Sequence, residues 1–126
     1  MKNMNKKVIT PDASLPFSEI VISNNTAYVS GQVSIDDKAN LVEGDIEAQT
    51  KVTLENLKKV LENAGLGLEN VVRTGCYLLN RKDLPGFGKV YAEYFTKDKP
   101  ARSTIFISSL PIEGTIVEID AVAMVE

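Results

Sequence analysis

One stretch of helical periodicity, enclosed by β-rich runs, most strongly limits the folds open to this chain. From Asp45 onward, apolar and small side chains recur every three or four residues. They are Thr50, Thr53, Leu54, Leu57, Val60, Leu61 and Ala64, with charged and amide side chains between them. Gly65 follows at the place where glycine commonly ends a helix. The spacing predicts an amphipathic helix over 45–64 with strands on both sides of it.

The runs on both sides of this helix are rich in β-branched and aromatic residues, which is typical of strands. They cover residues 7–10, 19–23, 26–33, 71–79, 100–107 and 116–125. Asn24 and Asn25, between the second and third runs, predict a tight hairpin because asparagine tolerates positive φ. Gly31 inside the third run indicates a bulge or a close backbone approach. A turn at 36–40 is expected to lead to a short strand at 41–42.

A second helix is expected from the Asp83–Pro85 segment onward, with an aromatic apolar stripe that includes Phe87, Tyr91 and Phe95. The element order β-β-β-α-β-α-β-β then indicates an α+β fold. We expect a single domain over residues 1–126, in which one mixed β-sheet carries both helices on one face. The other face would expose valine, isoleucine and phenylalanine, which predicts association with other chains.

The residues that the chain lacks exclude several kinds of site. There is no histidine and only one cysteine, Cys76. Histidine-containing zinc sites, Ser-His-Asp triads and Cys-His dyads therefore cannot form within one chain. An intrachain disulfide is excluded for the same reason. Cys76 lies in the middle of a predicted strand, where a cysteine is usually a small buried hydrophobe rather than a nucleophile.

The net charge and the hydropathy pattern limit which partners and which cellular location we expect. The formal net charge of −3 argues against nucleic acid, since a basic domain would be expected for that partner. No run approaches the ~18 consecutive apolar residues that a membrane span requires. Residues 1–7 are basic but are not followed by an apolar segment, so we do not expect a secretory signal. These features favour a cytoplasmic protein.

Two charged residues interrupt the closing strands. Arg102 lies near the start of the first, and Glu118 near the start of the second. A guanidinium group can hold a small carboxylate with two parallel hydrogen bonds, and a glutamate can take a proton from water. On the residues alone, the simpler explanation is that the two are solvent-facing strand charges or a structural ion pair. If both face the same side of one sheet, they flank a small cleft, but the sequence does not determine the register.

Short motifs along the chain resemble the RidA/YjgF family of enamine and imine deaminases, from about residue 7 to 125. Pro100–Ser103 (Pro-Ala-Arg-Ser) and Ile116–Ile119 (Ile-Val-Glu-Ile) look like the C-terminal signature of that family. Ser30–Gln32 resembles its Ser-Gly-Gln segment. Asn63–Gly65 with Val71–Thr74 resembles its passage from helix to strand. Each motif is short, and their shared order and spacing make the resemblance specific.

The resemblance implies a chorismate-mutase-like fold and a homotrimer with its sites between subunits. It implies hydrolysis of 2-imino acids such as 2-iminobutanoate and 2-iminopropanoate, derived from enamines such as 2-aminoacrylate, to 2-keto acids and ammonia. Arg102 matches the arginine that binds the substrate carboxylate, and Glu118 the glutamate that activates water. Gly31 matches a backbone contact in the cleft. No metal or cofactor is implied, which agrees with the missing histidines and with a substrate that is already labile.

Three positions depart from the family pattern. Phe17 replaces a tyrosine, so that a hydroxyl is lost from the expected substrate-binding wall. Gly88 stands where many members carry an asparagine, ahead of the helix tyrosine matched by Tyr91. Thr104 stands where many members have a cysteine, at a position where the backbone contacts the ligand. These departures bear on substrate preference and rate, while Arg102 and Glu118 are retained.

Three functions follow as hypotheses. The first is a 2-iminobutanoate/2-iminopropanoate deaminase. The second is a non-catalytic trimer that binds a small carboxylate between subunits and regulates a metabolic partner; the departures at Phe17 and Gly88 favour it slightly. The third is endoribonuclease activity, attributed to some relatives, against which the acidic charge and the absence of histidine both count.

Overall fold

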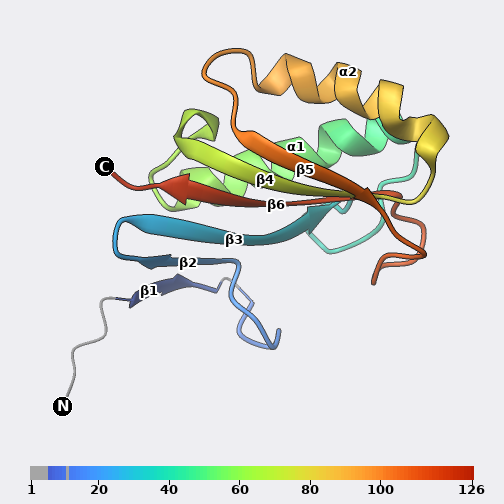
Figure 1. The fold of residues 1–126 in the computed structure, drawn as a ribbon. Helices are drawn as coiled ribbons and strands as arrows, with labels where there is room; N and C mark the ends of the chain where they lie inside the picture. The colour runs from blue at the N-terminus through green and yellow to red at the C-terminus, as the bar shows by residue number, and fades with distance from the viewer. Residues whose placement is uncertain (1–5, 11) are drawn as a thin grey trace.

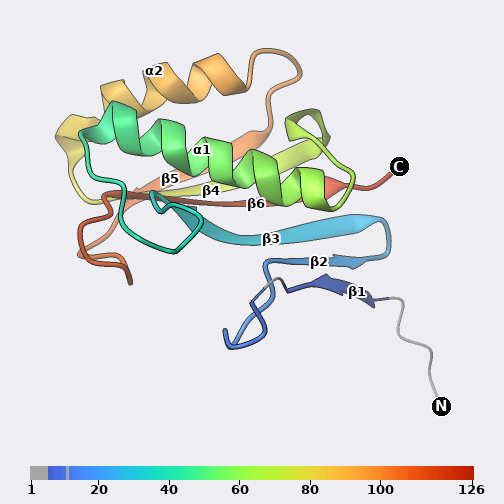
Figure 2. The same ribbon diagram turned by 180° about the vertical axis from the view of Figure 1, so that it is seen from behind.

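Two layers make up the computed structural model, which describes residues 6–10 and 12–126. One layer is a six-stranded mixed sheet, and the other consists of two helices that both lie on the same face of that sheet (Figures 1 and 2). The predicted α+β fold, with one mixed sheet and both helices on one face, is therefore confirmed. The expectation about a secretory signal rests largely on residues 1–5, which lie outside the described residues.

The strands run in the spatial order β1-β2-β3-β6-β4-β5. Their bounds are β1 Lys6–Ile9, β2 Ile20–Ser23, β3 Thr26–Val33, β4 Val71–Leu78, β5 Ala101–Phe106 and β6 Val117–Met124. The helices are α1 Ile46–Asn63 and α2 Leu84–Tyr94. β4 and β5 pair in parallel, and every other neighbouring pair is antiparallel. The last strand of the chain, β6, is thereby inserted between β3 and β4.

Local chemistry explains the ends of the first helix and the β2–β3 hairpin. Asp45 caps α1 by accepting a 2.9 Å hydrogen bond from the backbone N–H of Ala48. Gly65 follows the helix with a φ of 77°, a conformation that only glycine adopts without strain. Asn24 and Asn25 turn the hairpin with φ values of 51° and 63°. The predicted helix and the predicted hairpin are both confirmed.

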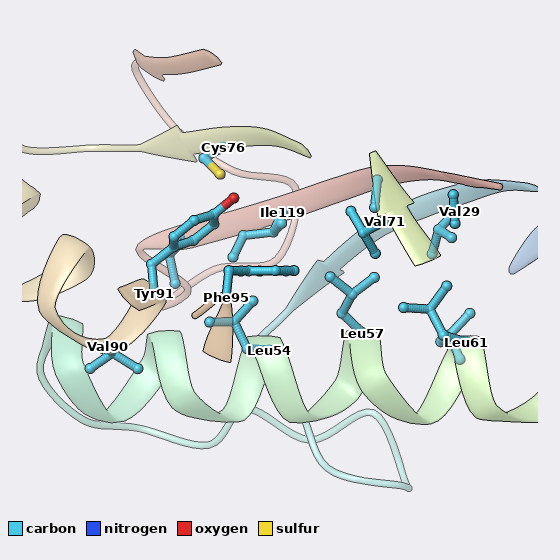
Figure 3. Close-up of a cluster of buried hydrophobic side chains, with 14 of the residues drawn as sticks. Val29, Leu54, Leu57, Leu61, Val71, Cys76, Val90, Tyr91, Phe95 and Ile119 are labelled. Atoms are coloured by element: carbon cyan, nitrogen blue, oxygen red, sulfur yellow. The ribbon is translucent and has the colours of Figure 1, made fainter. Parts of the chain in front are cut away.

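The core lies between the helices and the sheet (Figure 3). From α1, Leu54, Leu57 and Leu61 point at the sheet with no exposed surface. Each such leucine stabilises the fold by roughly 1.5–3 kcal/mol. In β6 the odd-numbered residues from Val117 to Ala123 are buried, and the even-numbered ones are not. The second face of β6, which carries Glu118, is therefore turned away from the helices.

The face of the sheet without helices carries an exposed apolar stripe. Val8, Val21, Tyr28 and Val122 lie side by side across four strands, and Met124 lies at the end of β6; we call these five residues the apolar band. Tyr28 is 52% exposed, Val8 46% and Met124 44%. The expected exposure of apolar side chains on this face is confirmed. The association that it implies stays a prediction.

A bulge interrupts β3 where it passes the middle of β6. The register shifts between Val29, which pairs with Ala121, and Gln32, which pairs with Ile119. Gly31 lies within this irregular segment, as the glycine in the third run predicted. The bulge lies beyond the apolar band, near the part of β6 that carries Glu118.

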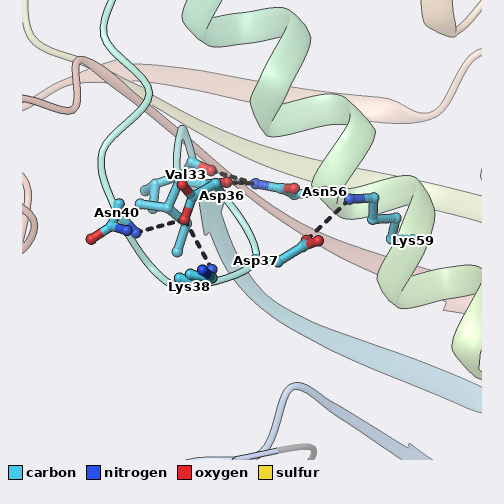
Figure 4. A network of polar contacts seen from close by, with 8 residues as sticks. Val33, Asp36, Asp37, Lys38, Asn40, Asn56 and Lys59 are labelled. Atoms are coloured by element: carbon cyan, nitrogen blue, oxygen red, sulfur yellow. Dashed lines mark hydrogen bonds and ion pairs between the residues drawn. The ribbon is translucent and has the colours of Figure 1, made fainter.

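Polar contacts hold the connection between β3 and α1 against the outer side of the helix (Figure 4). The side-chain amide of Asn56 donates 2.9 Å hydrogen bonds to the carbonyls of Val33 and Ile35. The prediction of a strand at 41–42 is wrong: in the described part of the chain, Leu41 forms a single bridge, with Ile35, across a turn in which the Asp36 side chain accepts a hydrogen bond from the backbone N–H of Asn40. Neither helix in the described part of the chain is long and apolar enough to cross a membrane.

Candidate functional site

Arg102 lies on β5, the strand at one edge of the sheet, on the side that faces α2. It pairs with Thr74 of β4, whose side chain is buried against the helices. The guanidinium carbon lies 4.6 Å from the centre of the Tyr91 ring and 5.3 Å from that of Phe87. Such contacts hold a guanidinium over aromatic faces without consuming its hydrogen-bond donors. An exposed arginine is thereby fixed with its donors available.

No carboxylate of the described residues neutralises Arg102. The two ion pairs within residues 6–10 and 12–126 join Lys59 to Asp37 and Lys89 to Glu47. The structural ion pair considered for Arg102 and Glu118 is therefore not formed within the chain. A preset guanidinium without a counterion suits the binding of a small carboxylate in the bidentate geometry that arginine favours.

Two buried hydroxyl groups lie next to each other beneath the aromatic rings that contact Arg102. The hydroxyls of Thr74 and Tyr91 lie 2.8 Å apart, and the Cys76 thiol donates a weak 3.7 Å hydrogen bond to Thr74. Burial raises the pKa of Cys76 to about 11, more than the Thr74 bond and the charge of Arg102 lower it. Cys76 is therefore a buried, protonated thiol, as its mid-strand position predicted.

Two of the departing positions lie in the same region. Thr104 is half-buried on β5, two residues beyond Arg102 and on the same side of the strand, and it pairs with Cys76 of β4. Gly88 lies on α2, one turn before Tyr91. A Cβ at Gly88 would meet no other atom within 4 Å. The structure therefore leaves room for a larger side chain at Gly88.

Glu118 projects from the opposite face of the sheet. Its neighbours along β6, Val117 and Ile119, are fully buried toward the helices, so the alternation of the strand turns Glu118 away from them. Glu118 is half-buried, and burial raises the pKa of its carboxyl group, with a further rise from the negative charge of Asp120. A raised pKa brings a carboxylate closer to the range in which it exchanges protons near neutral pH.

Gly31 forms a wall beside the Glu118 carboxylate. A Cβ at position 31 would lie 2.8 Å from the Cδ atom of Glu118, closer than real Cβ contacts allow. A side chain at position 31 would therefore force the Glu118 carboxylate to move away from its present place.

Phe17 lies in the loop before β2, which is tied to the residue that precedes Gly31. The Ser30 hydroxyl donates a 2.6 Å hydrogen bond to the carbonyl of Ser18, and the Ser30 N–H donates a 3.0 Å bond to the carbonyl of Glu19. Phe17 is 54% exposed. Its ring is therefore available to another molecule, on a loop that is hydrogen-bonded to the residue before Gly31.

The expected site residues thus fall into two groups. We call Arg102, Thr104 and Tyr91 the arginine half-site, and Glu118, Gly31 and Phe17 the glutamate half-site. In β4, Thr74 pairs with Arg102, and Tyr77 pairs with both Glu118 and Ile105. Ile105 therefore shares the face of Glu118, while Arg102, three residues earlier, faces the other way. The cleft that Arg102 and Glu118 would flank on a shared face does not exist within one chain.

One feature beside Glu118 was not anticipated from the sequence. Asp120 accepts hydrogen bonds from the Tyr77 hydroxyl and from the backbone N–H of Gly75, at 2.8 and 3.1 Å. The alternation that places Glu118 and Asp120 on one face was visible in the sequence. Their link to β4 was not, because it depends on which strand lies next to β6.

One surface groove belongs to neither half-site. A groove of about 360 Å³ lies between α1 and the 36–42 segment, lined by residues that include Asp37, Lys51 and Lys59. In residues 6–10 and 12–126, no group of three or more Asp, Glu or Cys side chains is arranged to hold a metal ion.

Comparison with known proteins identifies the family of the chain. Residues 8–125 match the family model described as Endoribonuclease L-PSP. The chain is 33% identical over 129 residues to the human 2-iminobutanoate/2-iminopropanoate deaminase, covering 98% of this chain and 93% of that protein. It is 40% identical over 112 residues to a RutC family protein from Pyrococcus horikoshii, covering 88% of each.

Solved structures agree with the sequence comparison. YyfA, a Rid family protein from Yersinia pestis, superposes with a TM-score of 0.88 at 39% identity, covering 95% of this chain and 99% of that one. Yeast Mmf1 superposes with a TM-score of 0.86 at 30% identity, covering 99% of this chain and 98% of the other. On the family model, the curated relatives and the shared fold together, the chain belongs to the RidA/YjgF family, in which the matching model carries the description Endoribonuclease L-PSP.

Proposed function

We propose that the protein is a deaminase that hydrolyses 2-imino acids, such as 2-iminobutanoate and 2-iminopropanoate, to 2-keto acids and ammonia. The observation that carries this proposal is Arg102, an arginine without a counterion in the described chain, held over two aromatic rings. A 2-imino acid has a carboxylate beside its electrophilic carbon, so it offers the group that such an arginine binds. The human relative that bears this activity in its name supports the same substrate class.

The active assembly in this proposal is a homotrimer. The glutamate half-site of one subunit would face the arginine half-site of its neighbour, because one chain turns Arg102 and Glu118 to opposite faces of its sheet. The exposed apolar band supplies a surface that a second copy could cover. A ring of three subunits repeats one such contact and closes.

The chemistry follows from the two half-sites. Arg102 binds both carboxylate oxygens and so fixes the imine carbon. Glu118 accepts a proton from water as the oxygen bonds to that carbon, and it passes this proton to the imine nitrogen, which gives a carbinolamine. Glu118 then takes the hydroxyl proton of the carbinolamine and delivers it to the amino nitrogen, so that the C–N bond breaks and ammonia leaves as the C=O bond of the keto acid forms. The pKa of Glu118, raised by burial and by Asp120, suits it to take and return a proton.

The test is a coupled assay in which a threonine dehydratase releases the imine and keto-acid formation is followed. We expect the wild-type protein to accelerate that step. Arg102→Ala and Glu118→Gln should each lose on the order of 100-fold in kcat/KM, the scale of a positioning or proton-transfer group. Arg102→Lys keeps the charge but loses the planar fork, and should recover only part of the loss. Equal rates for wild type and Arg102→Ala would refute the proposal.

A non-catalytic sensor of small carboxylates is the second candidate. Phe17 and Gly88 favour it, because both positions lack the polar groups that many relatives carry there. Carboxylate binding that depends on Arg102, without turnover and without any effect of Glu118→Gln, would support the sensor and exclude the deaminase.

The description of the matching family model makes RNA cleavage a further outcome to test. The net charge of −3 counts against an RNA substrate. RNA cleavage that persisted in the Arg102→Ala variant would favour it. We also propose a cytoplasmic location, where pyridoxal-phosphate enzymes that release such imines would act.

A further inference from the structure

A carboxylate that no proposed step uses lies beside Glu118. Asp120 is two residues further along β6, so both side chains project from the same face of the strand. Both oxygens of Asp120 are held: Oδ1 accepts from the backbone N–H of Gly75 at 3.1 Å, and Oδ2 accepts from the Tyr77 hydroxyl at 2.8 Å. Tyr77 is itself the cross-strand partner of Glu118. Asp120 is therefore fixed by the same strand that flanks Glu118.

Gly75 provides the space for this arrangement. A Cβ at position 75 would lie 2.6 Å from Oδ1 of Asp120 and 3.0 Å from the Tyr77 hydroxyl. Glycine in the middle of a strand weakens the strand, and here it allows the close approach of Asp120 and Tyr77. The network thus accounts for a buried glycine that core packing does not explain.

Asp120 is the charged residue that raises the pKa of Glu118. On the flanking strands, β4 presents Tyr77 and β3 presents Gly31, and neither carries a charge at neutral pH. No lysine or arginine of residues 6–10 and 12–126 forms an ion pair with Glu118. Within the described chain, burial and Asp120 are the two causes that raise the pKa of Glu118.

Building on the proposed function, we propose that Asp120 is a positioning residue that makes Glu118 a stronger proton acceptor, and that Tyr77 and Gly75 hold Asp120 in place for this role. A fixed negative charge next to a carboxylate favours its protonated form. Pairs of carboxyl groups in unlike environments commonly divide their tasks in this way. Glu118 exchanges the proton, while Asp120 keeps both oxygens occupied and does not touch the substrate.

The pH dependence gives the sign of the effect. Glu118 must be ionised to act as the base, so the rate rises with pH as Glu118 loses its proton. The acid limb of the pH–rate profile is the range in which the rate rises with pH. Asp120 raises the pKa of Glu118, so it places this acid limb at higher pH. Removing the charge of Asp120 should therefore lower the pKa of Glu118 and move the limb to lower pH. A weaker base should also lower the plateau rate.

Asp120→Asn is the informative variant, because asparagine can keep both hydrogen bonds. Its oxygen accepts from Gly75, and its amide donates to the Tyr77 hydroxyl. We expect the acid limb of kcat/KM to move down by roughly 0.5–1 pH unit, the low end for a neighbouring charge because Glu118 is half-exposed. Tyr77→Phe is the matched comparison: it loses one of the two hydrogen bonds that hold Asp120 but keeps its charge, so its limb should move by less than that of Asp120→Asn.

A titration that needs no turnover separates this inference from the proposed function. In the full-length protein labelled with carbon-13 at its carboxyl groups, the Glu118 signal, assigned by its loss in Glu118→Gln, should titrate at lower pH in Asp120→Asn. An unchanged titration, or a uniform loss of rate with an unmoved limb, would overturn the role of Asp120. A shifted titration in a protein without deaminase activity would instead refute the proposed function and leave the coupling between the two carboxyl groups standing.

Discussion

Arg102 and Glu118 project from opposite faces of one sheet, although β5 and β6 both pair with β4. Thr74, the partner of Arg102, is buried toward the helices, while Tyr77, the partner of Glu118, faces the other way. No rearrangement of side chains alone can bring the two charged groups together, because the sheet lies between them. A site that uses both must take them from different copies of the chain.

Mixed assemblies test this relationship directly. In the proposed homotrimer, the Arg102→Ala and Glu118→Gln variants should each retain little activity in the imine assay, in line with the roughly 100-fold losses expected above. When the two variants are mixed and reassembled in equal amounts, about a quarter of the sites should combine an intact Arg102 with an intact Glu118, because each residue comes from a different, randomly chosen subunit. Activity should therefore return to about that fraction of the wild-type rate.

Two controls accompany the mixing experiment. Combining the two variants without denaturation and reassembly should restore activity only as fast as subunits exchange. A double variant that carries both changes in one chain should gain nothing when mixed with either single variant. Absence of recovery, with trimers confirmed by mass, would show that each site draws both residues from one subunit.

Gly31→Ala should disable Glu118 without unfolding the protein. The added Cβ would lie 2.8 Å from Cδ of Glu118, so the glutamate side chain must turn away. We expect on the order of a 100-fold loss in kcat/KM, similar to that of Glu118→Gln. Gly88→Ala is the matched control, because a Cβ there meets nothing within 4 Å and alanine favours a helix over glycine. Full activity in Gly31→Ala would contradict the placement of Gly31 next to Glu118 in the glutamate half-site.

Gln49 should matter for stability, because it anchors the loop that leads into β6. Its side chain is 2% exposed, donates a 3.0 Å hydrogen bond to the carbonyl of Gly114 and accepts a 2.9 Å bond from the N–H of Ile116. Gln49→Leu leaves both backbone groups unpaired, and we expect the free energy of unfolding to fall by about 2–4 kcal/mol. Urea denaturation at one protein concentration measures it. Asn63→Leu, at an exposed position of the same helix, should change stability by less than about 0.5 kcal/mol.

Cys76 should be inert toward alkylating reagents in the folded protein. Its pKa of about 11 means that roughly one thiol in a thousand is ionised at pH 8, and the side chain has no exposed surface. Iodoacetamide should therefore modify Cys76 only after unfolding, as mass spectrometry would show. Cys76→Ala should retain deaminase activity. Rapid alkylation of the native protein, or loss of activity in the alanine variant, would restore the thiol as a candidate nucleophile.

Local patterns in the sequence predicted the elements well. The periodicity of α1, the asparagine pair of the hairpin and the alternation of β6 each depend on residues close in the chain, and each is confirmed. The pattern at 41–42 gave the wrong result, because Leu41 bridges to Ile35 across its own turn and not to a strand of the sheet.

Less of the candidate site than of the fold could be predicted from the sequence. Arg102 and Glu118 were found by their charge and by family resemblance, but their separation depends on strand order and on the parallel pairing of β4 with β5. The alternation of side chains within one strand does not tell which of its residues share a face of the sheet with given residues of another strand. The Asp120–Tyr77 contact was missed for the same reason, since it joins residues 43 positions apart in the chain.

The bulge in β3 allows two properties of the protein to change independently. Before it, Tyr28 belongs to the apolar band; within it, Gly31 walls the Glu118 carboxylate. In the proposed homotrimer, substitutions at Gly31 would therefore alter the pocket and leave the apolar band, the surface proposed for association, unchanged. A chain altered only at Gly31 should still assemble with the unaltered chain, which would give a ring with unlike pockets.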